Sequence, residues 1–143
     1  MDVLTQQQRR KTMAAVKGKN TACEIDVRKL LHEAGFRFRL HRRDLPGNPD
    51  IVLSKYRTVI FVHGCFWHQH QGCRASKRPS SRTEYWEAKL NRNMERDSLN
   101  VSRLRSLGWR VVVIWECETK DKQTLLMKLK QEICIDQKEK KPA

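Results

Sequence analysis

Three segments of the chain consist almost entirely of apolar residues, and they restrict the possible folds more than any other feature. They cover residues 50–53, 58–62 and 109–115, and the short turn 54–57 joins the first two as a hairpin. A strand that is apolar on both faces has to be covered on both faces. We therefore expect an α/β protein whose central mixed β-sheet carries helices on its faces.

Helical periodicity marks the segments that would cover this sheet. Residues 21–34 begin with Thr21 and Glu24 at capping-box spacing and stop at Gly35. In segment 81–107, one apolar stripe is formed by Trp86, Leu90, Met94, Val101, Leu104 and Leu107. The remaining expected elements are helices at residues 5–16 and 122–133 and a strand at residues 36–40.

Basic residues outnumber acidic ones, with 30 Lys and Arg against 16 Asp and Glu and a net charge of +14. This excess indicates a polyanionic partner, because Lys and Arg neutralise phosphates and release their counterions. The mean hydropathy of -0.75 and the lack of a long apolar run exclude a membrane-spanning protein. Since the N-terminus also lacks the apolar core of a secretory signal peptide, we expect a cytoplasmic protein that binds nucleic acid.

With 143 residues, the chain has the length of one ordinary domain. We expect that domain to cover residues 21–135. Residues 1–20 are expected to form an arm or helix that orders on the nucleic-acid partner, and residues 136–143 a basic, disordered tail.

Five cysteines are an odd number, and in a reducing compartment metal binding or burial is more common than a disulfide framework. Three soft ligands lie within one polar loop, and a fourth follows the last strand, from which folding can return it to the loop. This set predicts a tetrahedral zinc site formed by Cys65, His70, Cys73 and Cys117. The alternative is a set of buried thiols, and His68 competes with His70 as a ligand. Burial accounts better for Cys23 and Cys134.

Two carboxylates stand at positions where apolar residues would be expected. Asp50 opens an apolar strand, and Asp97 falls within the apolar stripe of the long helix. Carboxylate oxygens suit Mg²⁺, which also binds backbone carbonyls, water and substrate phosphate. The alternatives are that Asp50 accepts a backbone N–H and that Asp97 pairs with an arginine. Glu24 also has two interpretations: it is either a residue of the same site or part of the helix cap with Thr21.

The loop after the second apolar strand also contains histidines and large aromatic residues. His63 and His68 have near-neutral intrinsic pKa values, so either can accept a proton from water or position a phosphate-bound water. Phe66 and Trp67 are adjacent in this polar loop, and Trp86 begins the following helix. Such rings can insert between base pairs; the alternative is that they cover the zinc site as a small apolar cluster.

Taken together, these residues resemble the very short patch repair endonucleases. The resemblance covers about residues 11–117. Its segments are residues 49–50 (PD), 59–68 (VIFVHGCFWH), 82–86 (RTEYW), 93–97 (NMERD) and 108–117 (GWRVVVIWEC). It implies a restriction-endonuclease-like fold with a structural zinc. It also implies an enzyme that nicks one strand of double-stranded DNA beside the T of a T:G mismatch, left by deamination of methylated cytosine, and so starts very short patch repair.

The resemblance also implies roles for individual residues. Asp50 and the backbone carbonyl of Val62 would bind Mg²⁺, and His68 would be the catalytic histidine. His63 and Asp97 would position metal-bound waters, with Glu24 supporting the site. Zinc would be held by Cys65, His70, Cys73 and Cys117. The rings that enter the duplex would be those of Phe66, Trp67 and Trp86.

In two places the sequence departs from related patterns. Many related nucleases have Glu-x-Lys on the second strand, whereas this chain has Val62-His63-Gly64, so no lysine is available to activate water. In the metal loop, Gln69 and Gln71 stand where the family is often rich in histidine.

Two other functions account for part of the same pattern. A zinc-stabilised, non-catalytic DNA-binding or mismatch-sensing module would explain the charge, the cysteines and the aromatic residues. It would not explain carboxylates that repel phosphate. A sequence-specific nicking or restriction enzyme would act on fully paired duplex. For the favoured function, we expect a monomer that acts on nucleoid DNA with downstream repair proteins as further partners.

Overall fold

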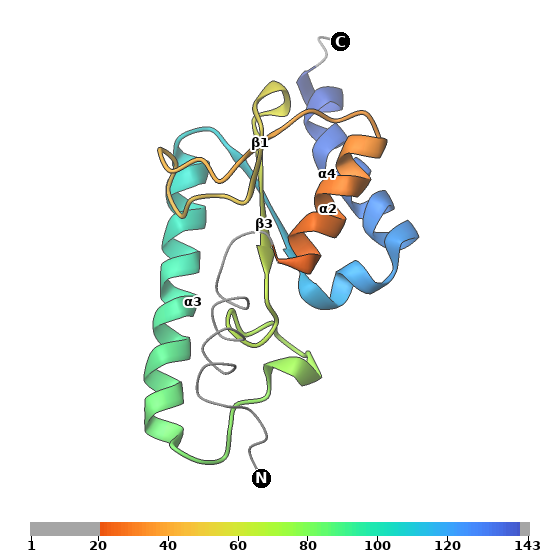
Figure 1. The fold of residues 1–143 in the computed structure, drawn as a ribbon. Coiled ribbons are helices and arrows are strands. Elements are labelled where there is room, and N and C mark those ends of the chain that lie inside the picture. Colours follow the sequence, from red (N-terminus) through yellow and green to blue (C-terminus); the bar gives the residue numbers. More distant parts are fainter. Residues whose placement is uncertain (1–20, 141–143) are drawn as a thin grey trace.

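The computed structural model describes residues 21–140, in which a four-stranded sheet lies between helices (Figure 1). The strands lie side by side in the order β1 (Arg39–Leu40), β2 (Ile51–Leu53), β3 (Thr58–His63) and β4 (Arg110–Trp115). Helices α2 (Ala22–Glu33) and α4 (Lys122–Lys140) lie on one side of the sheet, and α3 (Thr83–Ser106) lies on the other. The predicted mixed sheet between helices is confirmed, while the predicted N-terminal arm lies outside the described residues.

Strand directions explain how distant parts of the chain meet. β2 pairs antiparallel with both β1 and β3, and the one-turn helix η1 (Ser54–Tyr56) closes the predicted hairpin between β2 and β3. β4 pairs parallel with β3, in a register that runs from Thr58 opposite Arg110 to His63 opposite Trp115. Because a parallel pair needs a long crossover, α3 returns the chain from the end of β3 to the start of β4.

Each face of the sheet has its own apolar core, as strands apolar on both faces require. The core beneath α2 and α4 contains Val27, Leu31, Phe36, Ile51, Leu53, Ile60, Val112, Ile114, Leu125, Leu129 and Ile133. The core on the opposite face contains Leu45, Val52, Val59, Phe61, Leu104 and Trp109. Neighbouring strand residues alternate between these two cores, so the backbone of β3 is fixed from both sides before it reaches the polar loop.

The predicted strand 36–40 is wrong in its first half. α2 begins after Thr21, whose hydroxyl accepts the Glu24 N–H at 3.3 Å, and ends before Gly35, which has a φ of 93°. The Phe36 N–H then donates to the Leu31 carbonyl at 2.9 Å, and the ring enters the core. Phe36 therefore closes the helix end, and only β1 pairs with the sheet.

The apolar stripe predicted on α3 is only partly buried. Leu90 and Leu104 are fully buried, whereas Met94 and Leu107 are 44% and 55% exposed. Leu104 packs in the core on the α3 face of the sheet, whereas the N-terminal half of α3 contacts the polar loop. Most of this half is therefore free to line a functional surface.

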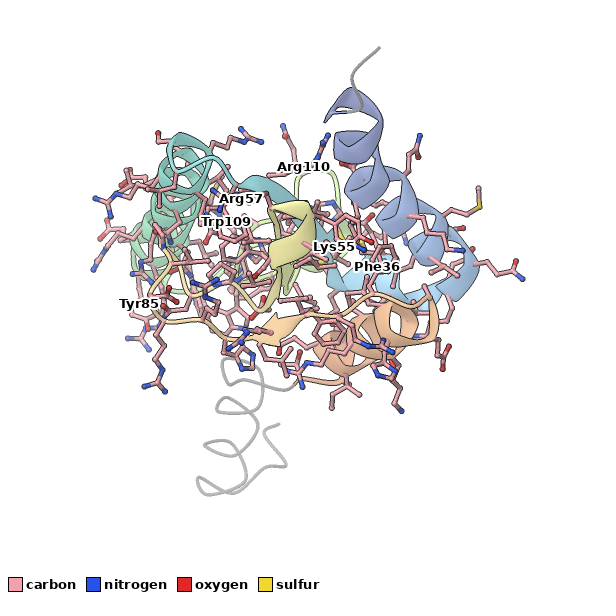
Figure 2. All side chains as sticks on the ribbon, turned by 90° about the horizontal axis from the view of Figure 1, so that it is seen from above. Phe36, Lys55, Arg57, Tyr85, Trp109 and Arg110 are labelled. Atoms are coloured by element: carbon pink, nitrogen blue, oxygen red, sulfur yellow. The ribbon has the colours of Figure 1, made fainter. Side chains whose placement is uncertain are left out.

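The far end of the sheet is closed by an arginine. The Arg57 guanidinium lies 4.6 Å from the centre of the Trp109 ring and donates to the Leu107 carbonyl at 3.2 Å (Figure 2). It thus satisfies one of the free carbonyls at the C-terminus of α3. This arrangement lies at the starts of β3 and β4, away from the polar loop that follows their ends.

The backbone of α4 continues past the predicted end at residue 133 and runs to Lys140. The disordered tail predicted from residue 136 is therefore helical as far as Lys140, in a segment rich in the helix-favouring residues Lys, Glu and Gln. Within residues 21–140, no helix combines the length and apolarity needed to cross a bilayer.

Candidate active site and metal centre

The parallel pairing of β3 and β4 brings two distant cysteines together. His63 and Trp115 are opposite each other at the ends of these strands, and Cys65 and Cys117 each follow two residues later. His70 and Cys73 come from the same loop as Cys65. The sulfur and ring-nitrogen atoms of these four side chains all lie within 4.8 Å of one another. The structure thus brings together the four ligands predicted from the sequence.

Distances within this four-residue cluster suit a metal ion. His70 Nδ1 lies 3.7 Å from Cys65 Sγ and 3.4 Å from Cys117 Sγ. Burial raises the pKa of the Cys65 thiol to about 12, so metal binding has to displace a firmly held proton there. His68 points elsewhere, which removes it as the competing ligand.

Trp115 connects this cluster to the neighbouring histidines, a role that sequence reasoning missed. Its ring stacks on His70, with centroids 4.3 Å apart and planes 11° apart. It also contacts His63 edge-on, at a centroid distance of 5.3 Å. The one sequence signal was its place at the end of the last apolar strand. Because Trp115 contacts both rings, it fixes the two groups relative to each other.

A second group is formed by His63, His68 and Asp97, whose ligand atoms also lie within 4.8 Å of one another. His68 Nδ1 lies 2.6 Å from Asp97 Oδ2, so Asp97 pairs with a histidine and not with an arginine. The rings of His63 and His68 are stacked, with centroids 3.8 Å apart and planes 5° apart. Burial lowers the pKa of His63 to about 4, and the charge of His68 acts in the same direction. His63 is therefore neutral at physiological pH.

A third group contains Asp50 and Glu24, two acidic residues that the sequence placed 26 positions apart. Asp50 Oδ2 accepts the Val62 N–H at 2.7 Å, so this carboxylate does cap a backbone amide at the end of β3. Burial, together with the nearby negative charge of Glu24, raises the pKa of Asp50 to about 7. Two carboxylates held side by side at low exposure form a strong candidate site for a cation.

Sequence reasoning did not identify two further members of this group, His41 and Arg28. His41 Nε2 and Arg28 Nη2 each lie 3.1 Å from Glu24 Oε2. His41 also donates its backbone N–H to the Asp50 carbonyl at 3.2 Å. Its position directly after the predicted strand 36–40 gave no chemical signal. At the start of α2 the Glu24 backbone N–H donates to the Thr21 hydroxyl, while the Glu24 carboxylate lies beside His41 and Asp50.

The predicted aromatic residues form one cluster beside these groups. The Phe66 ring lies edge-on to Trp67 and to Trp86, at centroid distances of 5.1 and 5.4 Å. Trp67 and Trp86 are 6.0 Å apart, and all three side chains remain partly exposed. Lys89 lies 5.7 Å from the Trp67 ring. The cluster is therefore neither buried in a core nor separate from the basic surface.

A single cleft of about 1390 Å³ is lined by the His63–His68–Asp97 group, by Asp50 and Glu24 and by part of α3. The cleft is lined by the polar residues Glu24, Asp50, His63, His68 and Asp97, together with Val62. Helix α3, which carries Asp97, also contributes Lys89, Arg92, Arg96 and the amide side chains of Asn93 and Asn100. Trp67 and Tyr85 also line the cleft. A polyanion entering the cleft would meet these three cations of α3 together with the carboxylates and histidines of the two groups.

Comparison with known proteins shows the family to which this chain belongs. A family model described as DNA mismatch endonuclease Vsr matches residues 1–74. A type II nicking enzyme of Xanthomonas oryzae pv. oryzae, V.XorIIP, is 50% identical over 90% of this chain and 94% of its own length. The chain belongs to the Vsr family of DNA mismatch endonucleases.

Other similar proteins agree with this membership. The DNA mismatch endonuclease Vsr of Escherichia coli K12 is 45% identical to this Vsr-family chain over 87% of it and 79% of the relative. Among solved structures, the catalytic domain of the homing endonuclease I-Bth0305I matches 82% of this chain and 98% of its own, with a TM-score of 0.58 and 22% identity. That similarity shows the fold alone and confirms the predicted restriction-endonuclease-like class.

Membership of the Vsr family confirms the predicted activity at the level of its class. The protein is a DNA mismatch endonuclease, and DNA is its partner. The alternative of a non-catalytic DNA-binding module is therefore excluded. The residue roles predicted within the cleft, the identity of the metals and the specificity for T:G stay predictions, and the geometry above is the basis for proposing them.

Proposed function

We propose that this endonuclease hydrolyses one phosphodiester bond beside the T of a T:G mismatch, in a magnesium-dependent reaction that starts very short patch repair. The observation that carries the proposal is the His68–Asp97 pair. This pair lies in the same cleft as the Asp50 and Glu24 carboxylates and beside the aromatic cluster. Acid–base groups, a cation site and rings suited to stacking on bases are thus within reach of one bound duplex.

The donor chemistry around Asp50 fits Mg²⁺. Asp50 and Glu24 are hard oxygen donors, and the pKa of Asp50 is raised chiefly by burial and also by the negative charge of Glu24, two effects that a bound cation would offset. We assign Asp50 and the Val62 backbone carbonyl as the protein ligands, with Glu24 supporting the site. When bound, the ion neutralises the scissile phosphate and lowers the pKa of the attacking water.

His68 is proposed as the residue that accepts the proton of that water. With its Nδ1–H donated to Asp97, the ring presents Nε2 as the basic atom, and Asp97 stabilises the imidazolium that forms. The stacked ring of His63 is neutral, so it adds no charge that would oppose protonation of His68. We propose that His63 and Asp97 also orient the waters around the phosphate.

The four-residue cluster fits a structural zinc ion. Zn–S bonds of about 2.3 Å and Zn–N bonds of about 2.0–2.1 Å at a tetrahedral angle place sulfur and nitrogen about 3.6 Å apart. The two observed separations, 3.7 and 3.4 Å, lie on either side of that value. We therefore assign Cys65, His70, Cys73 and Cys117 as zinc ligands. All four coordination positions are filled by protein, which leaves none for substrate.

DNA would lie along α3, with its phosphates near Lys89, Arg92 and Arg96. Phe66, Trp67 and Trp86 would then insert at the mismatch. A T:G wobble pair is weakly held, so separating it from its neighbours costs less there than at a paired site. Selectivity would thus come from deformation of the duplex as well as from contacts with base edges.

A nick in one strand requires one active site, and every proposed site residue lies on the same chain, so we propose that the enzyme acts as a monomer. Its catalytic unit would be residues 21–135, with residues 1–20 contacting the DNA. The product of the reaction is a nicked strand that still contains the mispaired T. Repair proteins that remove and resynthesise this strand would therefore act next on nucleoid DNA.

Strand-resolved cleavage tests the proposed function. Duplexes that carry one T:G pair in varied flanking sequences are incubated with Mg²⁺ or with EDTA, beside A:G and fully paired controls. We expect a magnesium-dependent nick on one side of the T in some flanks. Cleavage of the paired controls at an equal rate would instead support a sequence-specific nicking enzyme that acts on fully paired duplex.

A further inference from the structure

The aromatic cluster stands on a loop with little regular structure of its own. Between β3 and α3, the described backbone contains one short helical turn, η2 (Arg74–Ser76). Phe66 and Trp67 nevertheless have defined positions, with Phe66 packed edge-on against Trp86 of α3. Contacts other than secondary structure must hold this segment, because rings that insert between stacked bases have to keep their position while the bases tend to stack again.

Gln69 is the first part of that support. Its side-chain amide donates to the Phe66 carbonyl at 2.7 Å and to the Ser76 carbonyl at 3.0 Å, so both amide hydrogens are used. Its backbone has a φ of 52°, in the left-handed region that is unfavourable for a residue with a Cβ. The contacts of its side chain offset this strain. Gln69 therefore connects the aromatic segment to η2, the turn that follows the proposed metal ligand Cys73.

Arg78 extends the connection to α3. Its Nε donates to Gln69 Oε1 at 2.9 Å, and its Nη2 donates to Asn91 Oδ1 at 2.8 Å. The planar guanidinium thus bridges two neutral acceptors in fixed directions, which a lysine ammonium does not reproduce. A second anchor comes from the same helix, since Asn93 Nδ2 donates to the Trp67 carbonyl at 3.1 Å.

We propose that Gln69, Arg78 and Asn91 form a positioning relay that fixes the Phe66–Trp67 segment on α3 and thereby sets the preference for mismatched over paired duplex. The inference rests on the proposed role of these rings at the mismatch. Binding to paired duplex depends mainly on phosphate contacts. Insertion of the rings adds affinity only where the bases separate. If the loop were not held in place, ordering it on binding would cost free energy and offset the affinity gained by insertion. The affinity for mismatched duplex would therefore fall, and that for paired duplex would change little.

The experiment measures affinity for T:G and paired duplexes by fluorescence anisotropy without Mg²⁺, and the single-turnover nicking rate at saturating DNA with Mg²⁺. Arg78→Ala breaks both links of the relay, Arg78→Lys keeps the charge, and Asn91→Ala removes the acceptor on α3. The matched control is Arg74→Ala, which removes the same charge from an exposed position of the same loop. Metal content and Tm are recorded for every variant.

For both Arg78 variants we expect the ratio of the two affinities to fall about tenfold, as for the loss of a charged hydrogen bond, and Asn91→Ala should show a smaller loss. The saturated nicking rate should stay within threefold of wild type. Phe66→Ala should abolish most of the preference, and adding Arg78→Ala to it should have little further effect, because the relay acts through the ring.

An unchanged ratio in Arg78→Ala would overturn the relay, and so would a normal ratio in Arg78→Lys, since charge alone would then suffice. Equal weakening on both duplexes would identify Arg78 as a phosphate contact. If Phe66→Ala loses the preference while Arg78→Ala keeps it, the relay fails and the proposed function stands. If wild-type protein shows no preference for T:G, the proposed function fails and the relay with it.

Discussion

Asp97 holds His68 by a contact of 2.6 Å between Oδ2 and Nδ1, although 29 residues separate them in the chain. Asp97→Asn should lower the single-turnover nicking rate about 10²–10⁴-fold, because the amide no longer fixes the basic tautomer or stabilises the imidazolium. Affinity for the mismatched duplex should change less than threefold. Asp44→Asn, at an acid paired with Arg42 on the exposed surface, is the control and should nick normally. A normal rate in Asp97→Asn would remove the pair from the reaction.

Asp50 is the carboxylate on which the proposed magnesium site depends. Asp50→Ala should reduce nicking below detection at any Mg²⁺ concentration, because among the described residues the carboxylate at the end of β3, bound to the Val62 N–H, is that of Asp50. Binding of T:G duplex in EDTA should persist, since it depends on cations and rings elsewhere in the cleft. Rates are measured on end-labelled duplex and binding by anisotropy. Nicking by the variant at the wild-type rate would refute the assignment of Asp50 to the metal.

The pKa of Asp50 predicts how stability varies with pH. Burial raises it from 3.8 to about 7, so between these values the folded protein binds more protons than the unfolded chain, and the free energy of unfolding falls as pH rises. Asp50→Asn should remove this loss. The free energy of unfolding of Asp50→Asn minus that of wild type should therefore increase by up to about 4 kcal/mol from pH 4 to pH 8.

Urea unfolding without added Mg²⁺ measures this difference across the pH range. The lowered pKa of His63, about 4, has the opposite effect, since its contribution is lost as pH falls from about 6.5, but it is common to both proteins and cancels. A difference independent of pH would show that Asp50 is not protonated near neutrality. Added Mg²⁺ should reverse the order by stabilising the wild-type protein alone.

Cys117 tests the metal centre. Cys117→Ser should reduce bound zinc from one ion per chain to substoichiometric levels and lower Tm by about 10 °C or more, since binding free energy contributes to folding. The control is Cys23→Ser, at a cysteine that accepts a contact from Thr119 at 3.6 Å outside the cluster. Metal content is measured by mass spectrometry. One zinc per chain in Cys117→Ser would mean that other ligands hold the ion.

Phe66 and Trp67 are predicted to provide selectivity. The double variant Phe66→Ala/Trp67→Ala should lose most of its preference for T:G over paired duplex, with an expected cost of about 1–3 kcal/mol for each lost stacking contact. Affinity for paired duplex should change little. Leu40→Ala, which shortens an exposed apolar side chain on β1, is the control. A preserved preference would mean that the rings only cover the neighbouring metal cluster.

Local pattern was sufficient for most of the fold. Runs that were apolar on both faces predicted β2, β3 and β4, and caps and periodicity predicted α2 and α3 to within a few residues. The prediction failed at Phe36, which closes a helix, and at Met94, which faces away from a core. Both failures have one cause. The spacing of apolar residues in the sequence is the same whether the residue packs on a sheet, at a helix end or beside a loop.

The sequence alone was sufficient to single out most of the candidate site residues: two carboxylates stand out in apolar segments, and most of the histidines, candidate metal ligands and aromatic residues lie in one polar loop. Their partners were decided only by tertiary structure. Parallel pairing of β3 and β4 brings Cys65 beside Cys117 and lets Trp115 contact both His63 and His70. His41 likewise meets Glu24 only in the folded chain, whereas Arg28 contacts Glu24 one turn away on the same helix. Contacts between residues far apart in the chain depend on strand order and direction, and no local pattern specifies these.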